Sequence, residues 1–258
     1  MLVGDASSQS EHSFGACIVL QTLRAPGGYE GGKVGRMVGH YRYAVTRLAL
    51  LAGVVGPPLF VATFLIEGAT RRGYDPIRLQ VSYLSLSDQG WMQIANFCLS
   101  GALAIFFAWG LRQALRSGRV SFWAPLLIAA YGLGLIVSGV FVTDAAFGYP
   151  PGTPNGAERV TTFHGVLHVI PGTPLTFGSL ILAEVVMAWH FWRDRTTRKW
   201  AIFSLASLVL FVAPPFFIDD TSIGLSQRIS IIVLEVWLTV IAARFLILTA
   251  RAGEASPG

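Results

Sequence analysis

The sequence is poor in charge and in cysteine. Of its 258 residues only 13% are Asp, Glu, Lys or Arg, whereas soluble domains carry about 25%. It has two cysteines. Cys17 lies in a weakly patterned N-terminal segment and Cys98 inside an apolar run, so we expect neither a disulfide framework nor a cysteine zinc site. These shortages argue against a soluble domain with a charged surface and against a disulfide-stapled secreted domain.

Apolar sequence is what the chain has in quantity. Its residues are 53% hydrophobic, the mean hydropathy is +0.58, and the apolar residues gather in six runs. The runs cover residues 44–66, 92–111, 122–142, 163–191, 200–218 and 223–249. Each can cross a hydrocarbon core of about 30 Å as a helix, and none shows the alternating polarity of a barrel strand. We therefore predict an all-α polytopic membrane protein, a six-transmembrane-helix bundle over residues 44–250.

The basic residues predict the orientation of the bundle. They are frequent before the first run, after the second and fourth runs and near the C-terminus, and sparse in the other loops. Because cytoplasmic loops carry the excess of Lys and Arg, both termini are predicted to be cytoplasmic in the plasma membrane. The net charge of +5 is spread over short loops rather than gathered on one phosphate-binding face, so we expect no nucleic-acid partner. The expected partner is the lipid bilayer.

Both ends of the chain are predicted to be cytoplasmic tails, over residues 1–43 and 251–258. The first contains glycine-rich sequence and has no basic region before its short apolar stretch, which predicts a flexible segment rather than a secretory signal. Met37 stands just before a basic segment and the first apolar run, and we take it as an alternative start of the chain.

One junction on the predicted outer side collects residues that carry chemistry. It comprises VFVTDAAFGYP at 140–150 and TTFHGVLHVIPGTP at 161–174. His164 and His168 stand four positions apart, so they would share one face of a helix. With Asp144 they would form a set of two histidines and one carboxylate, the ligand count of a catalytic zinc site with an open position. Pro171 and Pro174 predict a bend just below.

The same residues also have structural readings. Asp144 can cap a turn, and a histidine pair at the start of a helix can bind water and lipid headgroups. Ser82 and Ser85 lie in the loop before the second run, where apolar residues recur at helical spacing from Ile77 to Leu84 and predict a short amphipathic helix at the outer interface. Serine in such a helix often bonds to its own backbone. We take Ser85 as the candidate that would polarise a substrate carbonyl.

Four segments carry a family resemblance: VSYLSLSDQGWMQIANFCLSG, SGVFVTDAAFGYPPGT, FHGVLH and GLSQRISIIVLEVWL. Together they resemble a bacterial and archaeal family of six-helix membrane proteins of unassigned function, from about Arg47 to Phe245. The resemblance implies a fold and a location, and no activity.

A looser likeness concerns the HxxxH pair together with an Asp and a Ser. In these residues the chain is similar to membrane hydrolases of the alkaline ceramidase and adiponectin receptor type, and that likeness implies zinc. The chain differs from them in having six predicted helices rather than seven and no third histidine on the predicted outer face.

The leading hypothesis is a metal-dependent membrane hydrolase of a lipid or amphiphile. Asp144, His164 and His168 would bind Zn²⁺, which lowers the pKa of its bound water to about 7, and Ser85 would assist. The alternative is a non-enzymatic protein, either a transporter or an assembly partner of an envelope complex. A transporter would show broken helices paired between repeats, and the Pro-Pro pairs at 57–58 and 214–215 are weak signs of such symmetry.

Overall fold

The computed structural model describes residues 32–115, 118–156 and 160–254. This part of the chain is helical apart from its loops and contains no strand, which confirms the predicted all-α class. The predictions for residues 1–31 and 255–258 lie outside the described residues. Helix begins at Gly32, ahead of the run predicted from residue 44, and Met37 lies within that helix.

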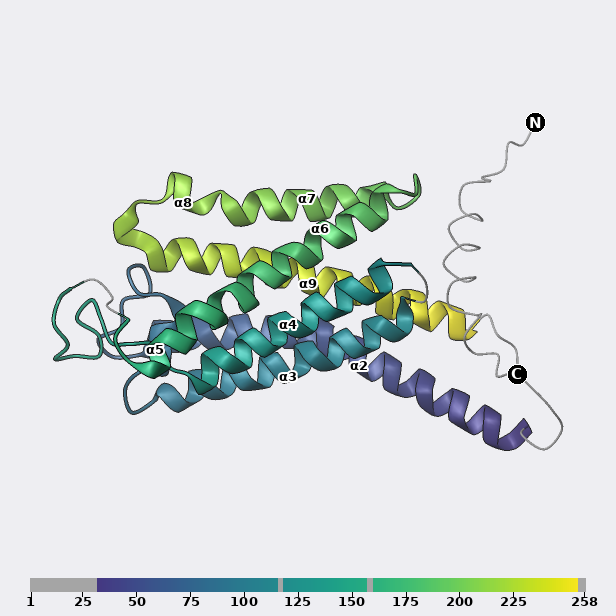
Figure 1. Ribbon diagram of the computed structural model, residues 1–258, viewed down its shortest axis with the longest axis horizontal. Helices are drawn as coiled ribbons and strands as arrows, with labels where there is room; N and C mark the ends of the chain where they lie inside the picture. The colour runs from purple at the N-terminus through teal and green to yellow at the C-terminus, as the bar shows by residue number, and fades with distance from the viewer. Residues whose placement is uncertain (1–31, 116–117, 157–159, 255–258) are drawn as a thin grey trace.

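Six longer helices lie roughly side by side in an elongated bundle (Figure 1). They are α2 (Gly32–Thr70), α3 (Gly90–Ala114), α4 (Val120–Val140), α6 (Ser179–Trp192), α7 (Arg198–Val212) and α9 (Ile223–Glu254). Shorter elements connect or extend them. They are η1 (Val81–Ser85), α5 (Phe163–Leu167), η2 (His168–Gly172), η3 (Pro174–Gly178), α8 (Pro214–Phe217) and η4 (Asp220–Ser222).

Five helical segments of the described chain are long and apolar enough to cross a membrane. They are Val38–Thr70, Gly90–Ala114, Val120–Val140, Phe163–Trp192 and Asp220–Glu254. The fifth predicted run, residues 200–218, forms α7 and α8 instead, which are separated next to Pro214. Proline has no backbone N–H to continue the helical ladder, so this run is divided. The chain is therefore a multi-pass membrane protein.

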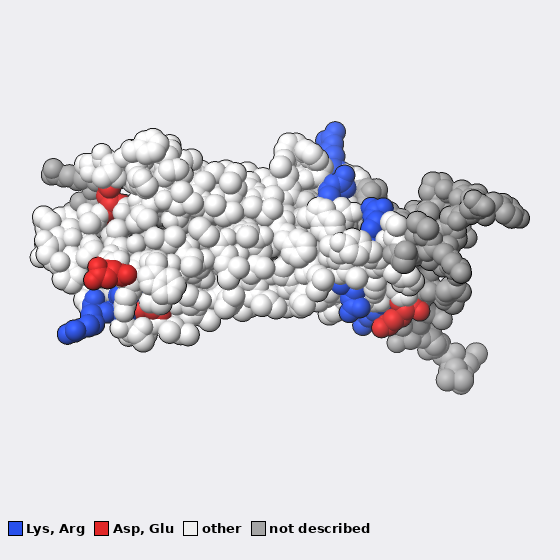
Figure 2. All heavy atoms as spheres, turned by 90° about the horizontal axis from the view of Figure 1, so that it is seen from below, with Lys and Arg blue, Asp and Glu red and all other residues white. Residues whose placement is uncertain are grey.

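On one face of the molecule the exposed charges lie near its two ends. On the face shown in Figure 2, the Lys, Arg, Asp and Glu side chains lie near either end, and a charge-free band separates them. A charged side chain at the centre of a bilayer is costly, so this band is the surface that we expect to face lipid.

Close helix packing depends on small residues. Gly101 of α3 and Gly132 of α4 face each other so closely that a Cβ on either would collide with the other's carbonyl oxygen. Gly134 lies likewise against the backbone at Thr176 of η3. Lipid supplies no hydrophobic force between helices, so van der Waals contact of this kind holds them together.

Candidate functional site

A cavity of about 210 Å³ lies inside the bundle. Its walls come from η1, α4, the π-helical turns η2 and η3, and α9, with one residue each from α2, α3 and α6. Ser82 and His168 line it, as do Tyr131 and Glu235. Gln227, beside η1, and Glu235 are eight residues apart on α9, which corresponds to about 12 Å. The cavity therefore has polar groups near the loop end of the bundle and again deeper inside.

Ser82 and His168 form a hydrogen-bonded pair at the loop end of the cavity. The Oγ atom of Ser82 lies 2.9 Å from Nε2 of His168, and Nδ1 of His168 lies 2.8 Å from the carbonyl oxygen of Phe141. A carbonyl oxygen can only accept, so Nδ1 must carry a proton. In the neutral imidazole Nε2 is then the acceptor, and the Ser82 hydroxyl donates to it. This is the arrangement in which a histidine can remove the proton of a serine nucleophile.

The helix that carries His168 is irregular at this point. α5 begins at its N-cap Thr162, whose hydroxyl accepts from the N–H of Gly165. The chain then passes into the π-helical turns η2 and η3, which contain Pro171 and Pro174. The predicted irregularity thus occurs as π-helical turns, a feature often found at functional sites. It leaves His168 buried at the cavity wall.

Ser82 is held in place by contacts between its loop and α9. Arg228 of α9 donates to the carbonyl oxygens of Pro76 (2.7 Å) and Leu79 (2.7 Å). It also bonds the hydroxyl of Tyr74. Gln227 accepts from the N–H of Val81 at 2.8 Å. The sequence suggested a short amphipathic helix here. The loop instead forms a turn and the buried 3₁₀ helix η1, because two internal arginines bind its carbonyl groups.

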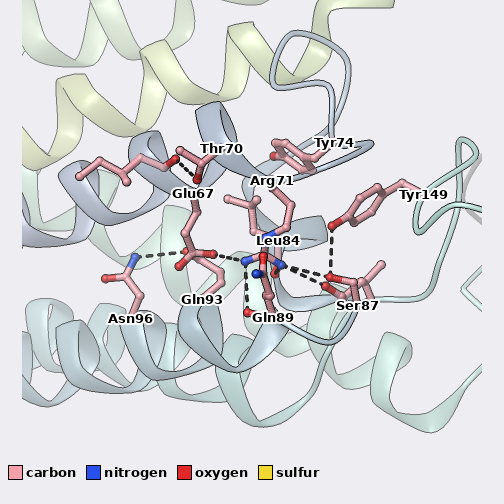
Figure 3. A network of polar contacts seen from close by, with 12 residues as sticks. Glu67, Thr70, Arg71, Tyr74, Leu84, Ser87, Gln89, Gln93, Asn96 and Tyr149 are labelled. Atoms are coloured by element: carbon pink, nitrogen blue, oxygen red, sulfur yellow. Dashed lines mark hydrogen bonds and ion pairs between the residues drawn. The ribbon is translucent and has the colours of Figure 1, made fainter.

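The second arginine, Arg71, fastens the other side of the same loop (Figure 3). It pairs with Glu67 at 2.6 Å and also donates to the carbonyl oxygens of Leu84 and Gln89 and to the hydroxyl of Ser87. The side chain is buried, so its charge is offset by these acceptors rather than by water. Between them the two arginines fix η1 over the cavity.

Asp144 has a structural position. Its carboxylate accepts from the backbone N–H groups of Thr161 (2.8 Å) and Thr162 (3.1 Å) and from the Thr162 hydroxyl (2.6 Å). Partial burial opposes ionisation, but these hydrogen bonds outweigh it and hold the pKa of Asp144 below its ordinary value. The carboxylate therefore joins the loop to the start of α5, where the helix dipole favours a negative charge.

The predicted zinc ligands are not brought together. His164 is exposed in the first turn of α5, where its ring contacts Phe141 and Phe163. Both nitrogens of His168 are occupied by the bonds to Phe141 and Ser82. In the described ranges no group of three or more His, Cys, Asp and Glu side chains could hold a metal ion. The spacing of the histidines was correct for a shared face, but only the deeper one reaches the bundle interior.

Ser85, the serine chosen from the sequence, lies outside the lining of the cavity. Its side chain is buried, and its hydroxyl has no hydrogen-bond partner in the described structure. Ser82 lines the cavity and meets His168. The sequence offered both serines and no signal to rank them, because a 3₁₀ helix does not follow the 3.6-residue spacing from which the loop was read.

Tyr131 and Glu235 were also missed as a pair. Tyr131 of α4 donates to Oε1 of Glu235 on α9, and both side chains are buried. A carboxylate inside a membrane helix is itself a signal of function. Its partner, more than 100 residues away in sequence, can only be seen in the fold.

A family model for DUF998, described as a protein of unknown function, matches residues 54–244. The chain belongs to the DUF998 family. The match includes Ser82, Tyr131, His168 and Glu235, and it confirms the family resemblance read from the sequence. Against curated proteins and against solved structures the chain gives no match, so the likeness to alkaline ceramidases stays a prediction.

Proposed function

We propose that this DUF998 chain is a membrane-embedded serine hydrolase that cleaves an acyl ester or amide of an amphiphile. The observation that carries the proposal is the Ser82–His168 pair, with its tautomer fixed by Phe141, at the edge of an internal cavity. The substrate class is the one expected from the sequence, a lipid or amphiphile, because the cavity lies among helices that cross a bilayer. Zn²⁺ takes no part in the proposed chemistry.

The reaction would proceed in two halves. The Oγ atom of Ser82 attacks the substrate carbonyl carbon while Nε2 of His168 takes the hydroxyl proton. His168 then gives this proton to the leaving alcohol or amine, and an acyl group remains on Ser82. Water, deprotonated by His168, attacks the acyl carbon and returns the free serine with release of the acid. The carbonyl of Phe141 occupies the orienting position that Asp takes in a Ser-His-Asp triad. Since it is neutral, we expect a slower enzyme than one with a full triad.

The proposal includes six crossings with both termini in the cytoplasm. α7 has 15 residues, about 22 Å of helix, and α8 extends its run. Two hydrogen bonds hold α7 against its neighbours. Ser207 donates to Glu184 of α6 (2.7 Å), and Trp237 of α9 donates to Ser204 (2.9 Å). Two of the four arginines at the proposed outer end of the described chain, Arg71 and Arg228, are buried in structural networks. This strengthens the excess of exposed basic residues at the opposite end.

The test is covalent labelling of the purified full chain by a fluorophosphonate, which reacts with an activated serine. Wild type should be labelled and Ser82→Ala should not. His168→Gln should slow labelling by roughly 10²–10⁴-fold. Ser85→Ala and His164→Ala, in the same two segments, should label as wild type does. Equal labelling of Ser82→Ala would overturn the proposal. Loss of hydrolysis on chelation with recovery on adding zinc would favour the metal chemistry instead.

A transporter is the second candidate, and one observation favours it. The helix containing Pro171 and Pro174 is π-helical where it lines the cavity, and irregular backbone at membrane depth is tolerated where it lines a cavity. Uptake of an amphiphile into vesicles that contain the Ser82→Ala variant would support transport and argue against hydrolysis.

A further inference from the structure

The deeper end of the cavity has a carboxylate with no cationic partner. Glu235 is 4% exposed, and its Oε1 atom accepts from Tyr131. Among the residues that the structure describes, no donor bonds its second carboxylate oxygen. No Lys or Arg is among the residues lining this cavity.

The surroundings of Glu235 are aromatic and apolar. Phe60, Phe97 and Phe177 line the same cavity, together with Tyr131. A carboxylate in a cavity lined by aromatic side chains suits an ammonium group, because the charge pairs with the carboxylate and aromatic rings attract a cation. An anionic or uncharged group would leave the carboxylate without a counter-charge.

We propose that the inner end of the cavity binds the protonated amine or quaternary ammonium group of the ligand, with Glu235 as the counter-ion and Tyr131 orienting it. This deepens the proposed function, on which it rests for the identity of the site: the substrate is an amphiphile with a cationic nitrogen separated from its acyl bond by about 12 Å or less. The volume of about 210 Å³ is below the roughly 300–1,000 Å³ of most ligand pockets. The cavity therefore holds a headgroup or a short chain, and the rest of a longer molecule would remain in lipid.

The experiment compares four probes with the same hexyl chain in nonionic detergent: hexylamine, hexyltrimethylammonium, hexanol and hexanoate. Binding to the purified full chain is measured by calorimetry. The two cations should bind wild type at least about tenfold more tightly than hexanol or hexanoate. Glu235→Gln should remove this preference, and Tyr131→Phe should reduce it.

Glu184→Gln is the matched control, because Glu184 is an equally buried membrane carboxyl that bonds Ser207 and does not line the cavity. It should keep the preference for cations. Folding of each variant is checked by its elution volume and far-UV circular dichroism, and if Glu235→Gln does not fold, the wild-type preference alone decides. Equal binding of hexanol and hexylamine to wild type, or a preference that survives in folded Glu235→Gln, would overturn the inference.

The outcome is separate from that of the hydrolase test. None of the four probes has an ester or amide bond to cleave, so their binding does not depend on the proposed hydrolysis. Cation binding without fluorophosphonate labelling would leave the cation site standing and remove the hydrolase. Fluorophosphonate labelling without a preference for cations would leave the hydrolase standing and remove the cation site.

Discussion

At the scale of single residues, the site depends on which atom of each polar group is already occupied. Phe141 fixes the proton of His168 on Nδ1 by offering only an acceptor, and this leaves Nε2 for Ser82. The carboxylate of Asp144 accepts hydrogen bonds from Thr161 and Thr162, which lie in the same junction. Asp144, which was expected to bind a metal, therefore connects the loop to the start of α5 through hydrogen bonds.

Asp144→Asn should lower the stability of the folded protein by about 1 kcal/mol at pH 7, since an amide replaces a charged acceptor at a helix start. A carboxyl whose pKa is lowered by folding stabilises the fold above its ordinary value of 3.8 and loses that contribution as the pH falls through the lowered pKa. The difference between wild type and Asp144→Asn should therefore shrink below about pH 4.

Thermal unfolding across this pH range checks the prediction, with exposed Asp88→Asn as the control that should unfold as wild type does. Fluorophosphonate labelling of Asp144→Asn should persist, because the carboxylate does not contact Ser82 or His168. Complete loss of labelling in a folded variant would contradict the structural role of Asp144.

At the scale of elements, the loop of residues 71–89 acts as a rigid cover because it is tied to two helices. Burial raises the pKa of Tyr74 to about 12, although the nearby Arg228 opposes the rise. The phenol therefore stays protonated at ordinary pH. It donates to the carbonyl oxygens of Leu79 and Gln80 while its oxygen accepts from Arg228. The loop is thus held to α9 and to itself by both neutral and charged hydrogen bonds.

Arg228→Lys should loosen this cover. A lysine cannot reproduce the forked contacts to Pro76, Leu79 and Tyr74, so the buried network should lose on the order of 2–4 kcal/mol. Hydrogen exchange of residues 76–85 should accelerate, and fluorophosphonate labelling of Ser82 should slow. Arg78→Lys is the matched control, because Arg78 is exposed in the same loop. Unchanged exchange in Arg228→Lys would show that other contacts hold η1.

At the scale of the whole molecule, the two ends differ in how they use arginine. The end that carries η1 and α5 buries two arginines as structural clamps, and the end that carries the α6–α7 loop exposes a basic cluster. In that cluster Arg193 and Arg198 lie over the rings of Trp189 and Trp192, the kind of aromatic position that is common at a membrane interface.

Accessible cysteines should reveal this polarity. In a background with Cys17 and Cys98 replaced by Ser, cysteine at Asp88, Thr153 or Thr221 should react with a membrane-impermeant thiol reagent in intact cells. Cysteine at Thr196 should react only after lysis. Thr221 tests the crossing by α7 specifically, because it follows α8. Protection of Thr221 together with labelling of Thr153 would show that α7 does not cross, and labelling of Thr196 alone would invert the orientation.

The sequence by itself determined the helical class, the membrane environment and the position of most spans. These follow from local quantities: the length and composition of apolar runs and the energetic cost of an unpaired backbone in lipid. The family was also readable from contiguous motifs, and the junction singled out at residues 140–174 contains His168 of the candidate site. The run at residues 200–218 was expected to be one helix, although Pro214 within it is a residue type that interrupts helices.

The tertiary structure alone decided the site. Ser82 and His168 are 86 residues apart, and Tyr131 and Glu235 are 104 apart, so their pairing is a result of helix packing that no spacing rule contains. In the same fold His164 is exposed outside the bundle, and Asp144 binds the residues at the start of α5. A buried polar side chain must bond to whichever polar group the fold brings within reach, and in these two pairs that group lies on another helix.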